Sequence, residues 1–299
     1  MKVIRFLQLV ILLQQAACNP SENEKQEMRK KVLDGLDRAV LIPLNPKKIL
    51  GLSPALTESL FFIVPDTNIC GVSTVCNFPQ DKVKLKPRIN IYPLDIEGII
   101  ALKPDLIFSE EGMTTAADAD QLEKAGFPLY IFKYRKTADI LSAMDSIYTW
   151  CPKKGNGKIM IDSLRKRLFL LEKKAENAKA SGSKVPGMLA ITWLDPIFAY
   201  GAQTWMSDKM RLAGGRNCLD KVLDKPYPTL QRETVLKLNP DVLFGGTFEK
   251  MDSTFFKMYP ELKNIPAYKN KKVFELVDDL ASRPSPRFLE AIKDLEKFK

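Results

Sequence analysis

The chain has 299 residues, of which 45% are hydrophobic and 27% charged, and its formal net charge is +10. This length suits two domains of ordinary size, and a mean hydropathy of −0.15 excludes a polytopic membrane protein. The sequence contains no histidine, the side chain on which hydrolytic triads and most metal-hydrolase sites depend. Lysine and arginine are scattered between acids without interleaved aromatics, which indicates solvated faces rather than a nucleic-acid interface.

The N-terminal segment has the pattern of an export signal. Two basic residues precede an apolar run, 6–13, that is too short to span a bilayer, and two alanines then lead into Cys18. This predicts a lipoprotein signal peptide over residues 1–17, with Cys18 as the lipidated first residue of an exported protein. The anchor would hold the protein to a membrane facing the periplasm or the cell exterior, and an ordinary signal peptide is the alternative. The polar residues that follow predict a tether over 18–46.

Residues 47–150 alternate between strand and helix patterns, which predicts an α/β lobe with parallel neighbouring strands. Ser53 can cap a helix whose first residue is Pro54. The expected strands are 48–52, 69–72, 105–109 and 129–132, and the expected helices are 54–64, 94–103 and 115–125.

A long connecting helix is expected within residues 151–183. Apolar residues at Ile159, Leu164, Leu168 and Leu171 suggest one stripe along a helix over 157–180. A single helix between two lobes resists bending, so it predicts a cleft that is nearly pre-formed.

The second lobe is expected over residues 184–299, with the same alternation of strand and helix. The predicted elements are a strand at 188–192, a helix at 204–213, a last strand at 273–277 and a C-terminal helix that starts near 285–287.

One helix-turn-strand unit occurs twice in the chain, at a constant offset of 136 residues. Leu94, Glu97, Leu102, Pro104, Asp105 and Phe108 recur as Leu230, Glu233, Leu238, Pro240, Asp241 and Phe244. The repeat predicts two similar lobes, and a cleft between lobes is where small molecules bind. Each lobe also presents a glutamate at the equivalent point.

The four cysteines beyond the signal region are Cys70, Cys76, Cys151 and Cys218. An oxidising compartment would allow disulfides among them, and the three possible pairings stay open. The chain has no CxxC motif, so no metal site is expected.

Short motifs from both lobes resemble those of a known family. They are Leu52-Ser53-Pro54-Ala55, Gly71-Val72-Ser73, Lys103-Pro104-Asp105-Leu106, Arg232-Glu233 and Ser285-Pro286-Arg287. From Lys48 to the C-terminus the chain resembles solute-binding proteins of ABC importers in which one helix joins the lobes. Members of this class carry cobalamin, ferric siderophores or haem, and the likeness is greatest to the cobalamin-binding members. The resemblance implies a monomer that delivers its solute to a permease homodimer with ATPase subunits.

The resemblance also assigns a role to the repeated glutamates. In the family, one glutamate in each lobe docks into a basic pocket on the permease, and the equivalents are Glu97 and Glu233. Charge pairs of this kind favour fast, oriented encounter. An acid in the first turn of a helix also stabilises the helix dipole, and the two roles are compatible. Glu58 and Glu110 are weaker docking candidates.

The ligand residues come from the resemblance alone. A large corrinoid requires aromatic and apolar walls with a few hydrogen-bonding groups. Val75 stands where the cobalamin-binding relative has an aromatic residue. The positions that match its binding residues, or lie in the same loops, are Val75, Phe78, Tyr92, Trp193, Tyr227, Asp279 and Arg283.

Two other ligands and one other class of function remain open. An anionic siderophore would require a cluster of cations, which Lys133, Arg135, Arg216, Arg232 and Arg283 could supply. Haem would need an axial tyrosine, for which the candidates are Tyr92, Tyr134 and Tyr227. The different class is a structural surface lipoprotein without a role in transport. No catalytic site or resident cofactor is expected.

Overall fold

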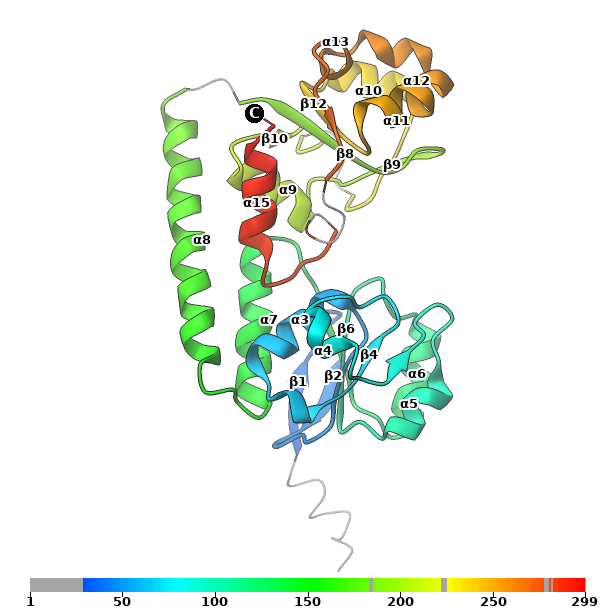
Figure 1. The fold of residues 1–299 in the computed structure, drawn as a ribbon, viewed down its shortest axis with the longest axis vertical. Coiled ribbons are helices and arrows are strands. Elements are labelled where there is room, and N and C mark those ends of the chain that lie inside the picture. The colour runs from blue at the N-terminus through cyan, green and yellow to red at the C-terminus, as the bar shows by residue number, and fades with distance from the viewer. Residues whose placement is uncertain (1–28, 183–184, 222–224, 277–279, 281, 299) are drawn as a thin grey trace, which may run out of the picture.

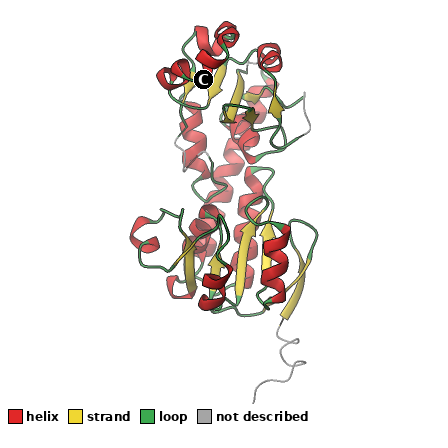
Figure 2. Ribbon diagram, turned by 90° about the vertical axis from the view of Figure 1, so that its right-hand side faces the viewer, coloured by secondary structure: helices red, strands yellow, loops and turns green. Residues whose placement is uncertain are grey.

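The computed structural model describes residues 29–182, 185–221, 225–276, 280 and 282–298. Two α/β lobes stand one above the other, and helix α8 (Gly157–Ala180) runs along both of them (Figure 1). Viewed from the side, each lobe contains its own sheet, and helices cross the narrow region between the sheets (Figure 2). The fold is therefore the predicted pair of lobes joined by a long helix.

The first lobe is built on a five-stranded sheet with the order β5-β4-β3-β6-β7, in which all neighbouring strands are parallel. Its strands are β3 (Ile49–Gly51), β4 (Ile69–Ser73), β5 (Arg88–Ile89), β6 (Leu106–Glu110) and β7 (Leu129–Phe132). Its helices are α3 (Pro54–Ile63), α4 (Gln80–Val83), α5 (Ile96–Leu102), α6 (Ala116–Lys124) and α7 (Thr137–Trp150), with a 3-10 turn η1 (Asp66–Asn68).

Helix α3 begins as the sequence predicts. The Ser53 hydroxyl accepts a hydrogen bond from the Leu56 amide, and Pro54 occupies the first helical position. Apolar side chains of the sheet form a core on each face, so the lobe is a sandwich of helices around parallel strands.

The second lobe has a six-stranded, mainly parallel sheet with the order β11-β9-β8-β12-β13, and β10 also pairs with β8. The strands are β8 (Gly187–Trp193), β9 (Ile197–Ala199), β10 (Arg216–Asn217), β11 (Thr229–Leu230), β12 (Val242–Phe244) and β13 (Val273–Phe274). Strands β9 and β11 are antiparallel to their neighbours. The helices are α9 (Trp205–Leu212), α10 (Arg232–Leu238), α11 (Phe248–Ser253), α12 (Phe255–Met258), η2 (Pro260–Asn264), α13 (Pro266–Lys269) and α15 (Phe288–Glu296).

The sequence repeat is also a structural repeat. Helices α5 and α10 both have seven residues, and both end in a left-handed residue, Lys103 with φ 49° and Asn239 with φ 45°. The repeated aspartate joins this unit to the first strand of its lobe. The Asp105 carboxylate accepts the Lys48 amide at 2.9 Å, and the Asp241 carboxylate accepts the Gly187 amide at 2.8 Å.

Helix α8 contacts both lobes. It packs against α3 and α7 in the first lobe and against α9 and α15 in the second. Its inward stripe is formed by Ile161, Leu164, Leu168 and Leu171. Ile159, which the sequence analysis placed in this stripe, is 71% exposed instead. Five residues separate it from Leu164, which is about 140° around a helix and therefore another face.

Part of the predicted tether is folded. Strands β1 (Arg29–Leu33) and β2 (Ala39–Pro43) form an antiparallel pair whose buried Val40 and Ile42 join the core of the first lobe. Two further contacts hold this pair, since Gly35 donates its amide to Ile131 and Asp34 forms an ion pair with Arg38. The sequence analysis predicted a tether here because polar residues dominate the segment, and the alternation of apolar residues in the two strands is short. Residues 18–28 lie outside the described part of the chain.

The predicted disulfide is wrong for the described residues, where all four cysteines are free thiols. Each lies in its own packed environment: the Cys76 thiol is 3.1 Å from the Ser73 hydroxyl, and the Cys70 thiol donates to the Ile49 carbonyl. Burial raises the pKa of Cys70 to about 11 and that of Cys151 to about 12. These thiols are therefore protonated at neutral pH and poorly reactive.

Candidate functional site

The candidate ligand cleft lies where the two sheets present the carboxyl ends of their parallel strands. In open α/β sheets this edge is where ligands bind. The second lobe has a hollow of about 640 Å³ at the ends of β8, β12 and β13. Its lining residues include Ile191, Thr192, Tyr200, Phe244, Gly245, Glu275 and Ser282.

Several predicted ligand residues are large, exposed side chains, and none of the described ones lines this hollow. Tyr92 is 62% exposed, Trp193 is 63% exposed and Tyr227 is 55% exposed, and Val75 is half exposed. The Trp193 indole donates to the Asp195 carbonyl at 2.8 Å, and the Tyr227 ring lies 5.7 Å from that of Tyr200. Fixed, exposed aromatic faces offer contact area for an apolar ligand at little entropic cost.

Glu110 acts electrostatically on one tyrosine in each lobe. Burial raises the pKa of Tyr92 and of Tyr227, and the nearby charge of Glu110 raises both further. Tyr92 belongs to the first lobe and Tyr227 to the second, so the charge of one carboxyl group acts on a tyrosine of each lobe. Burial also raises the pKa of Glu110 to about 7, although a hydrogen bond from Ser53 opposes the shift. Sequence reasoning listed Glu110 only as a docking candidate.

A second cluster ties the lobes together near Phe78. The Glu58 carboxylate in α3 is fully buried, and Arg287 donates to it through Nε at 2.9 Å and Nη2 at 2.7 Å. Arg283 donates to the same carboxylate at 3.1 Å and to Asn77 at 2.7 Å. The Arg287 guanidinium also lies over the Phe78 ring, 4.1 Å from its centre.

This cluster changes the interpretation of two predicted residues. Arg283, a predicted ligand residue, is committed to an ion pair between the lobes, and Glu58, a weaker docking candidate, is inaccessible to any partner. Arg287 was named only within the motif Ser285-Pro286-Arg287 and was given no role. The signal for the pair was present, because Glu58 is the one acid within the otherwise apolar and hydroxyl-bearing helix α3.

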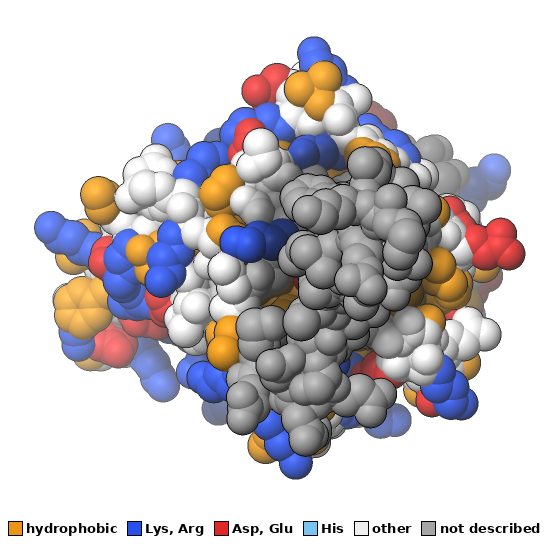
Figure 3. Space-filling model, turned by 90° about the horizontal axis from the view of Figure 1, so that it is seen from below, with side chains coloured by type: hydrophobic (Ala, Val, Ile, Leu, Met, Phe, Trp, Pro, Cys, Tyr) orange, Lys and Arg blue, Asp and Glu red, His pale blue; other side chains and the backbone are white. Residues whose placement is uncertain are grey.

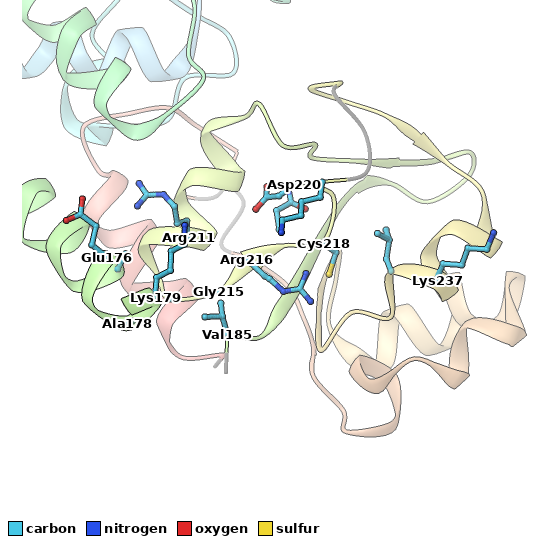
Figure 4. Close-up of a pocket in the computed structure, with 15 residues that line it drawn as sticks. Glu176, Ala178, Lys179, Val185, Arg211, Gly215, Arg216, Cys218, Asp220 and Lys237 are labelled. Atoms are coloured by element: carbon cyan, nitrogen blue, oxygen red, sulfur yellow. The ribbon is translucent and has the colours of Figure 1, made fainter. Parts of the chain in front are cut away.

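The cations proposed for an anionic ligand do not form one cluster. Lys133 and Arg135 lie beside Glu111, with Arg135 at 2.5 Å from that carboxylate. Arg232 lies between Glu233 and Glu261, at 3.0 and 3.2 Å. Arg216 lines a separate hollow of about 710 Å³ between the end of α8 and β10 (Figure 4). Among the described residues, these candidate cations therefore do not concentrate positive charge in the cleft.

Lys209 is a buried cation that sequence reasoning did not mention. Its amine donates to the Leu280 carbonyl at 3.1 Å and lies 3.6 Å from the centre of the Trp205 ring. Burial lowers the pKa of Lys209 well below its ordinary value. The side chain packs beneath the cleft, where α9 meets the segment before α15.

The two repeated glutamates occupy equivalent positions in the lobes. Glu97 is the second residue of α5 and Glu233 the second residue of α10, and both are exposed. Helices α5 and α10 lie on the side of the molecule opposite α8 (Figure 1). Hydrogen bonds from its own backbone amide and from Arg232 lower the pKa of Glu233, so it is ionised at neutral pH.

Two predicted functional residues, Cys18 and Asp279, lie outside the described part of the chain. Among the residues that are described, no group of histidine, cysteine, aspartate and glutamate side chains is arranged to hold a metal ion. None of the described helices is long and apolar enough to cross a membrane.

Comparison with known proteins places the chain in a family. The model of the family described as periplasmic binding protein matches residues 49–280. The vitamin B12-binding protein of Vibrio vulnificus (strain YJ016) is 26% identical over 249 residues, which cover 83% of this chain and 88% of the relative. An uncharacterized ABC transporter substrate-binding lipoprotein of Bacillus subtilis (strain 168), YvrC, is 24% identical over 94% of this chain and 91% of its own length.

A solved structure shares the fold. The crystal structure of the periplasmic vitamin B12-binding protein BtuF of Vibrio cholerae superposes with a TM-score of 0.70 at 22% identity, covering 85% of this chain and 96% of that one. The matched family is a class of exported binding proteins rather than enzymes, so no resident cofactor is required. The chain belongs to the periplasmic binding protein family, as a solute-binding protein of an ABC importer.

Proposed function

We propose that this protein captures cobalamin in the cleft between its lobes and delivers it to an ABC importer. The observation that carries the proposal is the exposure of Tyr92, Trp193 and Tyr227, together with the lack of a cluster of unpaired candidate cations among the described residues. A corrinoid is a broad ring with amide arms, so it can be held by aromatic walls and a few hydrogen bonds. The printed names of the vitamin B12-binding relatives support the same ligand.

The two other ligands fit the cleft less well. A ferric siderophore is anionic, and the candidate cations Arg135, Arg232 and Arg283 are already paired with carboxylates. Haem iron would be bound by a tyrosinate, but burial raises the pKa of Tyr92, Tyr134 and Tyr227 and so disfavours that form.

Titration calorimetry with cyanocobalamin tests the ligand. We expect one-to-one binding that weakens about tenfold when Tyr92→Ala or Tyr227→Ala removes one aromatic wall, because each loses an apolar contact worth about 1–2 kcal/mol. Phe169→Ala is the matched control, since Phe169 is 54% exposed on α8, away from the cleft. An absence of heat at micromolar protein, with binding of haem or a ferric siderophore instead, would reject cobalamin.

Glu97 and Glu233 are proposed to dock on the two subunits of the permease. Their equivalent positions in α5 and α10 and their exposure support this role. Reversing both charges, with Glu97→Lys and Glu233→Lys, should abolish solute uptake while the affinity for cobalamin stays unchanged. Glu249→Lys is the control, because Glu249 is also an exposed acid in a first helical turn, that of α11. A loss of solute affinity in the double variant would place these acids in the binding site instead.

Lipidation of Cys18 is proposed to anchor the protein to the membrane. The apolar run before Cys18 supports it, as does the word lipoprotein in the name of the Bacillus subtilis relative. Cys18→Ala should move the protein from the membrane fraction to the soluble fraction. Membrane attachment that persists in this variant would contradict lipidation at this site.

A further inference from the structure

The β1–β2 pair has two faces of different character. Directly opposite residues of an antiparallel pair share a face, and the register matches Lys31 with Leu41 and Leu33 with Ala39. Val32 and Val40 point to the other face, where Val40 is buried in the core of the first lobe. The outer face is formed by Arg29, Lys31, Leu33, Ala39, Leu41 and Pro43.

This outer face is both apolar and basic. Leu33 is 64% exposed and Leu41 is 41% exposed, and Lys31 is exposed between them. Within the described residues of the two strands there is no acid: Asp34 is buried in its ion pair with Arg38, and the exposed Asp37 lies in the connecting turn. Glu123, which pairs with Arg38, lines the same hollow as Arg29 and Leu41.

The pair lies at the end of the first lobe farthest from the second lobe (Figure 1). Seen from that end, the described surface carries many lysine and arginine side chains, together with hydrophobic and acidic ones (Figure 3). Only residues 19–28 separate Cys18 from Arg29. Ten residues reach at most about 35 Å when fully extended, so a lipid on Cys18 would keep this face close to the bilayer.

We propose that the outer face of the β1–β2 pair binds the surface of a membrane that contains anionic phospholipids. Leu33 and Leu41 would enter the interface between headgroups and acyl chains, while Arg29 and Lys31 contact lipid phosphates. The inference rests on one part of the proposed function, namely that export and lipid anchoring bring the chain to a bilayer. The contact would hold the first lobe at the membrane, close to a permease embedded in it.

Vesicle cosedimentation tests this contact without the lipid anchor. The chain from residue 18 onward, with Cys18→Ser, contains every described residue and carries no acyl group. We expect it to bind phosphatidylcholine vesicles that contain about one-third phosphatidylglycerol, and to bind pure phosphatidylcholine much more weakly, because the cations need anionic lipid. Added salt should weaken the binding.

Three variants identify the surface. Lys31→Glu should weaken binding to the anionic vesicles at least about fivefold, and Leu33→Glu with Leu41→Glu should abolish it. Ile159→Glu, at an apolar residue of α8 that is 71% exposed, should leave it unchanged. The inference is overturned if the chain does not bind, if it binds neutral vesicles equally well, or if the hairpin variants bind like the control. Titration of the same samples with cyanocobalamin tests ligand binding in the cleft separately. The mass of the natural protein tests separately whether Cys18 carries a lipid.

Discussion

Glu58 is a single carboxylate that holds two guanidinium groups from the other lobe. It has no exposed surface, and the side chains of Arg283 and Arg287 are only 12% and 13% exposed. Burying an ion pair of this kind removes both the acidic and the basic group from water, which costs free energy. Replacing one partner leaves the charge of the other buried and uncompensated. Glu58 therefore matters for the way the lobes meet as much as for the stability of α3.

We expect Glu58→Gln to lower the free energy of unfolding by about 3 kcal/mol, because two nearly buried cations lose their counter-charge. Urea unfolding measures the change. Glu123→Gln is the control: Glu123 also pairs with an arginine, Arg38 at 2.8 Å, but is 47% exposed, so its loss should cost about 0.5 kcal/mol. Equal effects of the two substitutions would show that the buried Glu58 pairs contribute no more to stability than an exposed pair.

The raised pKa of Glu110 predicts a pH dependence. Burial lifts this pKa from the ordinary 4.5 to about 7, so the folded protein keeps a proton that the unfolded chain has released. The free energy of unfolding should therefore fall by about 3 kcal/mol as the pH rises from 4.5 to 7, and this contribution should level off above pH 7.

Glu110→Gln isolates this contribution, because an amide does not titrate. Relative to the unmodified protein, the variant should be about 3 kcal/mol more stable at pH 8 than at pH 5, as measured by chemical denaturation at both values. A constant difference between the two proteins across this range would mean that Glu110 titrates normally.

The residues of the cleft were predictable from sequence to different degrees. Exposed aromatics such as Tyr92 and Tyr227 lie in loops beside prolines, where a core role is improbable on local grounds. Glu58 and Arg287 are separated by 229 residues. The sequence around a buried acid does not indicate which distant residue forms an ion pair with it. The Glu58–Arg287 pair could therefore be identified only in the folded structure.

At the scale of elements, the two copies of the repeat place different residues at the same strained point. Lys103 ends α5 and Asn239 ends α10, both with positive φ. This left-handed conformation is unfavourable for side chains with a Cβ, and asparagine tolerates it better than lysine.

The two sites therefore predict a ranking of stabilising substitutions. Lys103→Gly should raise the free energy of unfolding by about 1 kcal/mol, and Asn239→Gly by about half as much, because glycine adopts positive φ without a steric penalty. Chemical denaturation of the two variants provides the measurement. A larger gain from Asn239→Gly than from Lys103→Gly would contradict this account of the caps.

Elements with a long, regular pattern were predicted well, and short ones were not. The helix over 157–180 was predicted with its bounds, because many turns of apolar spacing and a glycine boundary define it. The β1–β2 pair was missed, since five-residue strands with only three inward apolar residues resemble a polar segment. The pair packs against the distant β7, and a contact between segments so far apart in the chain cannot be predicted from the local sequence.

At the scale of the whole molecule, three kinds of contact restrain the angle between the lobes. Helix α8 packs on both lobes. The Asp208 carboxylate of α9 accepts the Thr137 amide at the start of α7, at 2.8 Å. The Glu58 cluster adds charged contacts between α3 and the segment before α15. Because these contacts lie at different places, they restrain hinge bending more than any one of them would alone.

We expect the cleft to close only slightly on binding. Spin labels at Ile100 in α5 and Met258 in α12, both exposed and in different lobes, should report a distance that changes by no more than about 2 Å when ligand is added. Pulsed electron resonance gives the distance distribution directly. Glu58→Gln combined with Asp208→Ala should broaden the distribution of the ligand-free protein, since fewer contacts then restrain the angle. Arg165→Gln, at an exposed ion pair with Asp145 near the α7–α8 packing, should leave the distribution unchanged. A shift of many ångströms on binding in the unmodified protein would mean that the lobes open freely, and that the cleft seen here is one of several widths.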